Sequence, residues 1–322
     1  MSAIALLLSL LLMAASQDAK PVYPQADITS PRLQVTVHLP DRRSGYYRGT
    51  RFDWSGAIAS LRWQGHEYFG EWFERHDPFL HDGITGPVEE FQAGESSVGY
   101  AEAPVGGTFV RIGVGHVRKP EEPAYRRFAT YEIVNAGRWM IERGPASMTF
   151  VHELDEANGY AYVYRKTLRL EGDTMVLDHS LRNTGHKRIE TAVYNHNFFT
   201  LDRRPTGPQV SVTFPFDAKA TRPIAPLATL TARDLRFARE LASGETVFTE
   251  LEGFGTGRAD YDFLMKHAET GAAVRIRSDR PLTKLVFWSA PRTVCPEPYV
   301  DASVDPGQTT TWRITYEFSE IK

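Results

Sequence analysis

The stretch WRITYEF, Trp312 to Phe318, places an apolar or aromatic residue at every second position. The members of this apolar set are Trp312, Ile314, Tyr316 and Phe318. Because successive side chains of an extended chain point to opposite faces, a period of two puts the whole apolar set on one face. The stretch therefore predicts a β-strand with one buried face and one wetter face.

The same alternation recurs along the chain. It is clearest in Leu33–Leu39, Met175–Arg182 and Val210–Phe216. Two further stretches, Phe263–His267 and Ala273–Ser278, flank a short turn and predict a β-hairpin. Many strands separated by Gly, Pro, Asn and Asp turns favour a β-sandwich or barrel. We therefore expect an all-β fold, and the length of the chain favours one large sandwich over two separate ones.

The segment Thr231–Ser243 is the one place where a helix competes with a strand. Leu235, Ala238 and Leu241 have the three-residue spacing of a helix face. Leu235 and Phe237 have the two-residue spacing of a strand face just as well. The pattern leaves both structures open.

Charge and cysteine content exclude several classes of function. The 37 basic and 40 acidic residues are interspersed, and without a basic block or stripe we expect no nucleic-acid partner. The single cysteine, Cys295, cannot form a disulfide within the chain and offers no structural zinc cluster. No histidine pair has metal-ligand spacing on a helix, so we expect no metal site.

The N-terminus differs in composition from the rest of the chain. An almost unbroken apolar run, Ile4–Met13, precedes the small residues Ala14, Ala15 and Ser16. This order is typical of a signal peptide over residues 1–16, with residues 17–322 as a single mature domain that is periplasmic or secreted. A membrane-tethered N-terminus or a short buried helix is the alternative. No second apolar run is long enough to span a membrane, so we expect no membrane span in the mature chain.

The stretch YNHNFFTLD, Tyr194 to Asp202, contains the first candidate catalytic residue. Histidine has an ordinary pKa of about 6.5, which suits proton exchange near neutral pH. In a strand, Asn195 and Asn197 would point away from the face that carries His196. They could then contact a loop or a substrate. A satisfied core histidine is the alternative for His196.

The second candidate is Glu297, which stands between two prolines in TVCPEPYV. Pro298 disfavours helix at Glu297, and Pro296 has no N–H group for a sheet. We therefore expect a rigid rim after a strand over Leu285–Ser289. A carboxylate on such a rim is well placed to act as a general base. A solvated loop glutamate is the alternative.

The polar loop Asp77–Phe91 is a third candidate region. It contains His81, Asp82, Glu89 and Glu90, and functional groups often lie on such loops. A polar surface turn is the alternative. Aromatic side chains elsewhere could stack on sugars or fill the core. These are Tyr194, Phe198, Trp288, Tyr299, Trp54 and Trp63.

Two of these motifs together resemble a known family. YNHNFFTLD resembles the Asn-His-x-(Tyr/Phe)-Phe-(Asn/Thr)-Leu-Asp segment of the galactose mutarotases, or aldose 1-epimerases. VCPEPYV, followed by VDPGQTTTWRITYEF, resembles the closing Cys-x-Glu-Pro, Pro-Gly and final strand of that family. Residues 51–69, RFDWSGAIASLRWQGHEYF, resemble its opening hairpin, and DGITGPVEEF loosely resembles its Gly-Gly-x-Pro loop.

The resemblance implies a galactose mutarotase-like supersandwich of antiparallel sheets and an exported, divergent member of the family. It implies that His196 is the general acid and Glu297 the general base, without a cofactor. The implied ligand is a carbohydrate: a monosaccharide, a uronate or an oligosaccharide. We expect substrate contacts from six residues, which are Arg51, His81, Glu90, Asn195, Trp288 and Tyr299.

The chain also departs from the family pattern. The Asn-His-Gly-Gly loop with a second functional histidine is not found, and His81 is the nearest analogue. No clear arginine pair for a sugar phosphate is evident, although Arg51 and Arg111 are available. A non-catalytic carbohydrate-binding protein and a polysaccharide lyase, or another sugar-modifying enzyme on the same fold, remain the alternative functions.

Overall fold

The computed structural model describes residues 22–321. The expected signal peptide, residues 1–16, lies outside this part of the chain. Almost all regular structure between residues 22 and 321 is β-strand, with the short 3-10 turns η1 (Leu201–Arg203) and η2 (Arg258–Asp260) as its helical elements. None of the helical elements in this part is long and apolar enough to cross a membrane.

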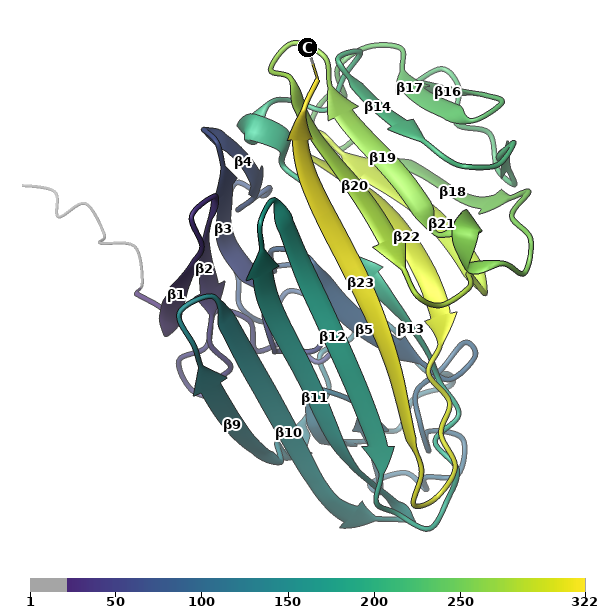
Figure 1. Cartoon of the computed structure of the whole chain (residues 1–322). Helices are drawn as coiled ribbons and strands as arrows, with labels where there is room; N and C mark the ends of the chain where they lie inside the picture. The colour runs from purple at the N-terminus through teal and green to yellow at the C-terminus, as the bar shows by residue number, and fades with distance from the viewer. Residues whose placement is uncertain (1–21, 322) are drawn as a thin grey trace, which may run out of the picture.

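Ten antiparallel strands form the large sheet, which faces the viewer in Figure 1. Their order is β16 (Ala228–Thr231), β17 (Asp234–Phe237), β14 (Val210–Thr213), β19 (Asp262–His267), β20 (Ala272–Ser278), β23 (Thr309–Glu320), β12 (Thr174–Asn183), β11 (Tyr160–Glu171), β10 (Ser147–Ala157) and β9 (Arg138–Arg143). The WRITYEF stretch lies in β23, near the middle of this sheet, and its apolar set is buried as predicted.

Six antiparallel strands form a second sheet behind the first (Figure 1). Their order is β15 (Lys219–Ala220), β18 (Val247–Glu252), β21 (Lys284–Ala290), β22 (Thr293–Asp301), β13 (Ala192–His196) and β5 (Val88–Gln92). Two small sheets complete the structure. One contains β1 (Gln25–Thr29), β2 (Leu33–His38), β3 (Ile58–Trp63) and β4 (His66–Phe69), and the other contains β6 (Thr108–Arg111), β7 (Gly115–Arg118) and β8 (Ile133–Asn135).

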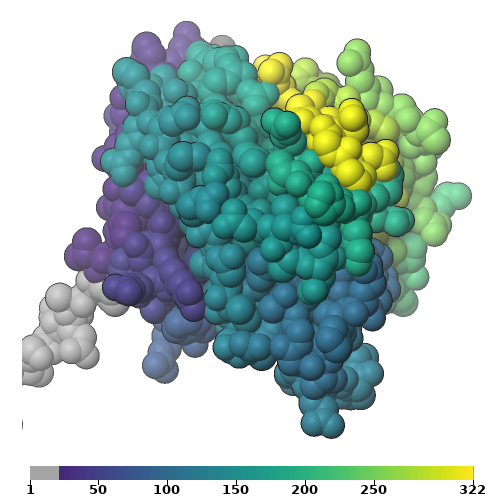
Figure 2. Space-filling model, turned by 90° about the horizontal axis from the view of Figure 1, so that it is seen from below, coloured from purple at the N-terminus to yellow at the C-terminus, as the bar shows by residue number. Residues whose placement is uncertain are grey.

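The core lies between the two larger sheets. Phe91 of β5 packs edge-on against Tyr164 of β11, with ring centroids 5.3 Å apart, and against Trp312 of β23. Seen from below in Figure 2, the N-terminal hairpins (purple) and the C-terminal strands (green and yellow) lie on opposite sides of the middle of the chain (teal). The predicted all-β sandwich of antiparallel sheets is confirmed.

The structure also tests the more local predictions from the sequence. The hairpin predicted from Phe263–His267 and Ala273–Ser278 is confirmed as β19 and β20. Within Thr231–Ser243, Asp234–Phe237 forms the strand β17, because Leu235 and Phe237 on one of its faces are buried in the core. Trp54 and Trp63 are buried core residues and not sugar platforms.

Candidate functional site

Three neighbouring strands of the six-stranded sheet bring the two sequence motifs together. In the register of β13 with β5, Tyr194 lies opposite Glu90 and Asn195 opposite Glu89. On the other side β13 pairs with β22, with Tyr194 opposite Tyr299. This pairing brings His196 of β13 to Glu297 of β22, with Nε2 and Oε1 3.2 Å apart.

A cavity of about 630 Å³ opens beside this pair. The walls include Arg51, Arg127, His196, Trp288, Glu297 and Tyr299. His81 and the exposed Phe128 also line it, and their rings stack with centroids 4.7 Å apart. The size is typical of a small-molecule site, and mixed aromatic and charged walls suit a polar ligand with apolar faces.

The imidazole of His196 is almost fully enclosed by aromatic rings. It stacks on Phe198 with centroids 3.7 Å apart and meets the edges of Phe52 and Trp288. Within residues 22–321, the Nδ1 atom has no hydrogen-bond partner, so Glu297 is the ring's polar contact. Burial, together with the charge of Arg51, lowers the pKa of His196 well below its usual value.

Glu297 is the acidic partner, and burial raises its pKa to about 7. The sequence placed it on a rim after a strand, and this was wrong, because the residue lies inside β22 opposite Val286 of β21. The flanking prolines are tolerated because β13 pairs with β22 only at residues 299–301, beyond Pro298. The carbonyl of Pro296 instead accepts a hydrogen bond from Asn197 Nδ2 at 2.6 Å.

A cluster of charges, here called the Glu90 cluster, adjoins the pair and consists of Arg51, Glu90, Arg127 and Tyr194. Arg51 donates from Nε to Glu90 at 2.8 Å, and Arg127 donates from Nε and Nη2 to both oxygens of Glu90 at 2.9 Å. The Tyr194 hydroxyl donates to Glu90 and accepts from both guanidiniums. Burial alone would raise the pKa of Glu90, but Arg51 and Arg127 hold it far below its usual value.

Arg127 is the residue that the sequence did not identify. It lies in the long loop between β7 and β8, where no motif or periodicity marks it. Arg51 and Arg127 therefore form a pair of arginines that could not be recognised in the sequence. Arg111 is buried away from the cavity, where Nη2 donates to the backbone carbonyl of Arg51 at 3.1 Å and supports that segment.

The loop before β5 is held against the strand that carries His196. A Cβ atom at Gly86 would lie 2.1 Å from the carbonyl oxygen of Asn197 and 2.9 Å from that of His196. Only glycine permits this approach. The loop is therefore not a polar surface turn. Its start brings His81 to the cavity, with Nδ1 3.3 Å from Nη1 of Arg51.

Asn195 and Glu89 point the other way, into the core. Here they form the Glu89 cluster with Lys166 of β11 and His179 of β12. One oxygen of Glu89 accepts from Lys166 Nζ at 2.5 Å, and the other meets His179 Nε2 at 2.8 Å and Asn195 Nδ2 at 2.9 Å. Asn195 is therefore directed away from His196, as expected, but it does not reach the cavity. This corrects its expected contact with substrate.

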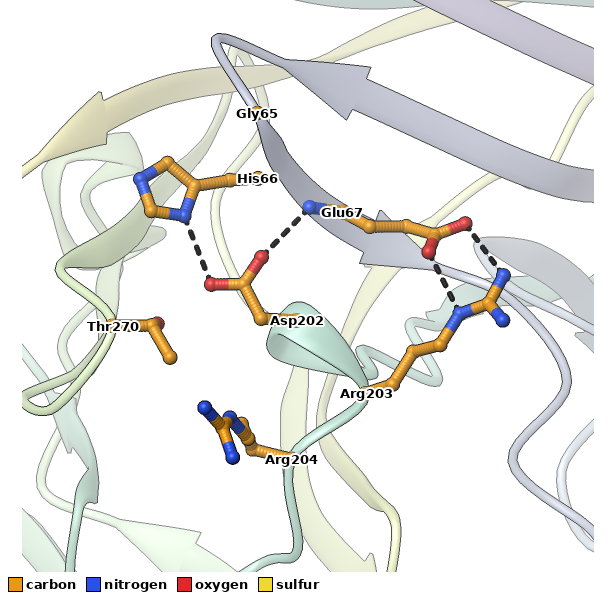
Figure 3. A pocket seen from close by; sticks show the side chains of 7 residues that line it. All are labelled: Gly65, His66, Glu67, Asp202, Arg203, Arg204 and Thr270. Atoms are coloured by element: carbon orange, nitrogen blue, oxygen red, sulfur yellow. Dashed lines mark hydrogen bonds and ion pairs between the residues drawn. The ribbon is translucent and has the colours of Figure 1, made fainter.

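The last residue of the YNHNFFTLD stretch, Asp202, lies at a separate, shallow hollow shown in Figure 3. Its carboxylate joins His66 Nδ1 at 2.9 Å and the backbone N–H of Glu67 at 2.8 Å. The same turn places Arg203 against the Glu67 carboxylate (Figure 3). Asp202 thus ties the turn after β13 to β4 and takes no part in the cavity.

Comparison with known proteins rests on structure alone. No family model matches the sequence, and no curated protein matches it. Solved structures do match over nearly the whole chain. The GalM/aldose epimerase homologue from C. elegans has a TM-score of 0.57 at 14% identity, over 94% of this chain and 100% of its own.

A Synechocystis protein has a TM-score of 0.59 at 12% identity, over 94% of this chain and 98% of its own. The galactose mutarotase related enzyme from Lactobacillus acidophilus has a TM-score of 0.56 at 13% identity, over 92% and 99%. The chain has the galactose mutarotase-like fold. At these identities the structural similarity confirms the fold and does not extend to the chemistry of the cavity.

Proposed function

We propose that the protein is an isomerase of the aldose 1-epimerase type, which interconverts the anomers of a sugar by opening and closing its ring. The observation that carries the proposal is the buried pair of His196 and Glu297, 3.2 Å apart in the wall of a sugar-sized cavity. Trp288 and Tyr299 line the same cavity and can stack on the apolar face of a pyranose.

The reaction requires a balanced exchange of two protons. Glu297 takes the proton of the anomeric hydroxyl, while His196 gives a proton to the ring oxygen. The open sugar turns about its C1–C2 bond, and the reverse transfers close the ring from the other face. The pair therefore starts and ends each half-reaction with one proton. Each positioned proton transfer contributes about 10² to 10⁴-fold to the rate.

The directions of the two pKa shifts support one resting place for this proton. Burial raises the pKa of Glu297 to about 7 and lowers that of His196, so the proton lies on the carboxyl in the free protein at pH 6. It reaches Nε2 of His196 across the 3.2 Å contact before the ring opens. A carboxylate and an imidazolium are then in place as base and acid.

The test is anomer equilibration, followed by polarimetry or anomer-resolved NMR with freshly dissolved α-anomers. We expect wild-type protein to accelerate equilibration of at least one sugar, and His196→Asn and Glu297→Gln each to lower the rate by about 10² to 10⁴-fold. Glu142→Gln, at a surface glutamate paired with Arg165 outside the cavity, is the control and should retain the rate. Sugar binding without acceleration in the wild type would instead indicate a non-catalytic carbohydrate-binding protein.

A second candidate is favoured by one observation: Arg127 Nη2 donates to the Tyr299 hydroxyl at 3.4 Å in a cavity that Arg51 and His196 also line. Guanidiniums that neutralise a uronate carboxylate, next to a base, are what a polysaccharide lyase needs. This candidate predicts an unsaturated product that absorbs in the ultraviolet. Incubation of the protein with polyuronates distinguishes the two reactions directly.

The site of action proposed here is the periplasm or the extracellular medium. The apolar run and small residues at 1–16 support export. The N-terminal sequence of the protein isolated from its native host tests this proposal. Recovery of the complete N-terminus from the cytoplasmic fraction would contradict it.

A further inference from the structure

We propose that the cavity selects sugars that carry a carboxylate, such as a hexuronic acid, and that the free ends of Arg127 and Arg51 bind this group. This inference names the ligand class of the site in the proposed function, and its identification as the reacting sugar rests on that function. The binding step itself does not, because it requires only the Glu90 cluster.

The first argument is the number of donors that the cluster leaves free. Glu90 receives Nε of Arg51 and both Nε and Nη2 of Arg127. In the described part of the chain, Nη1 of Arg127 makes no hydrogen bond. Nη1 of Arg51 has only the long contact of 3.3 Å to His81. Both guanidiniums line the cavity, so their remaining N–H groups are available to a ligand.

The second argument is charge. Two guanidiniums share the single carboxylate of Glu90, so the cluster keeps one uncompensated positive charge. One carboxylate of a ligand neutralises it, and a planar carboxylate matches the fork of a guanidinium. A phosphate dianion would exceed the single net charge of the Glu90 cluster, and Lys284, a further cation on the cavity wall, is already paired with Glu250. The cluster therefore fits a monoanion better than a dianion.

The third argument is access. The Glu90 side chain is fully buried, and that of Arg51 is 7% exposed, but that of Arg127 is 33% exposed. The loop that carries Arg127 is held in place at Ala129, whose carbonyl accepts a hydrogen bond from Thr50 Oγ1 at 3.2 Å. Arg127 is thus both oriented by Glu90 and reachable from the cavity. These are the properties of a preorganised anion contact.

Binding of a carboxylate would also prepare the proton pair. The charges of Arg51 and Arg127 help burial to lower the pKa of His196. A bound anion offsets those charges, so the imidazolium that the proposed reaction needs becomes easier to form. A carboxylate-bearing sugar would therefore gain in turnover as well as in affinity.

The experiment is calorimetric binding to the His196→Asn variant, which should not turn the sugar over. The ligands are glucuronate, its neutral amide, glucose and glucose 6-phosphate, and the set is repeated with galacturonate, its amide, galactose and galactose 6-phosphate. We expect the preferred uronate to bind at least tenfold more tightly than its amide or the neutral sugar. The phosphate should bind no better than the uronate. Equal affinity for uronate and amide would overturn the inference, and so would a preference for the phosphate.

A second comparison locates the contact. Arg127→Gln should abolish the preference for uronate over amide, and Arg127→Lys should retain part of it. Arg118→Gln, a surface arginine paired with Glu132, is the control and should change nothing. An unchanged preference in Arg127→Gln would contradict the assignment. Arg127-dependent uronate binding without anomer exchange would retain the inference and reject the proposed function.

Discussion

Two neighbouring glutamates on β5 show how one strand can serve two purposes. Glu89 and Glu90 differ by one position, so their side chains point to opposite faces of the sheet. Both are fully buried, and each carboxylate meets two basic side chains. Glu89 faces the core between the sheets, whereas Glu90 faces the arginines of the cavity.

The two clusters differ in whether their basic side chains keep N–H groups that no protein atom within residues 22–321 accepts. The Glu89 cluster is closed, since Lys166 gives a further hydrogen bond to the carbonyl of Ser55 and is itself 0% exposed. The Glu90 cluster is open, since Arg127 is partly exposed and keeps donors toward the cavity. A closed cluster holds the two sheets together, and an open one is available for recognition.

Removal of the cation of the closed cluster, Lys166, should have the largest effect on stability. Among the described residues, Lys166→Met leaves the fully buried Glu89 carboxylate with His179 and Asn195 as its hydrogen-bond partners and without its cation. We expect a loss of about 3 to 5 kcal/mol in the free energy of unfolding, measured by urea denaturation at pH 7. Lys219→Met on the exposed strand β15 is the control and should change it little. A loss below 1 kcal/mol would show that water reaches the cluster.

The next effect concerns Asp53, which is buried beside the Glu89 cluster. Burial, opposed by Lys166, raises the pKa of Asp53 to about 7 from 3.8. A carboxyl whose pKa is higher in the folded than in the unfolded protein stabilises below pH 3.8, and this stabilisation is lost as the pH rises to about 7. Glu297 acts in the same direction between 4.5 and about 7.

Asp53→Asn should therefore be more stable than wild type at pH 8, by about 1 to 3 kcal/mol, with little difference at pH 4. Urea denaturation from pH 4 to 8.5 measures this, and the double variant with Glu297→Gln should show the flattest profile. Parallel profiles for Asp53→Asn and wild type would mean that Asp53 is ionised throughout.

The sequence predicted the strands well because burial of one face leaves a period of two. It also paired His196 with Glu297, although only through resemblance to a family, since nothing local joins residues of separate strands. Arg127 could not be predicted, because a loop residue acquires its role from Glu90, 37 positions away.

The remaining errors have physical causes as well. Pro296 and Pro298 normally interrupt sheets, and the sequence does not show that the ladder to β13 stops before them. Glu89 was expected in a polar loop, and its place in β5 could not be predicted, because a charge in the core is unfavourable without a partner. That partner, Lys166, is 77 positions away, on the opposite sheet.

The pH dependence of catalysis tests the proton pair in the cavity beside the Glu90 cluster. The proposed reaction needs one proton on the pair of His196 and Glu297, and the pair loses it as the pH rises through about 7. We expect the enzymatic rate, after subtraction of the buffer rate, to fall about tenfold per pH unit above 7. A rate that rises through pH 7 to a plateau would show that ionised Glu297 acts without an acid.

The smallest expected effect is the loss in the free energy of unfolding when Arg127 is removed from the Glu90 cluster. Arg127→Gln leaves Glu90 with Arg51, the Tyr194 hydroxyl and Gln92 Nε2, and water can enter at the partly exposed site that Arg127 vacates. We therefore expect a loss of about 1 kcal/mol or less in the free energy of unfolding, far below that of Lys166→Met. Urea denaturation of both variants at one pH gives the ratio directly. Equal losses would mean that the two clusters are equally closed. Arg127 would then stabilise the fold and would not be kept for a ligand.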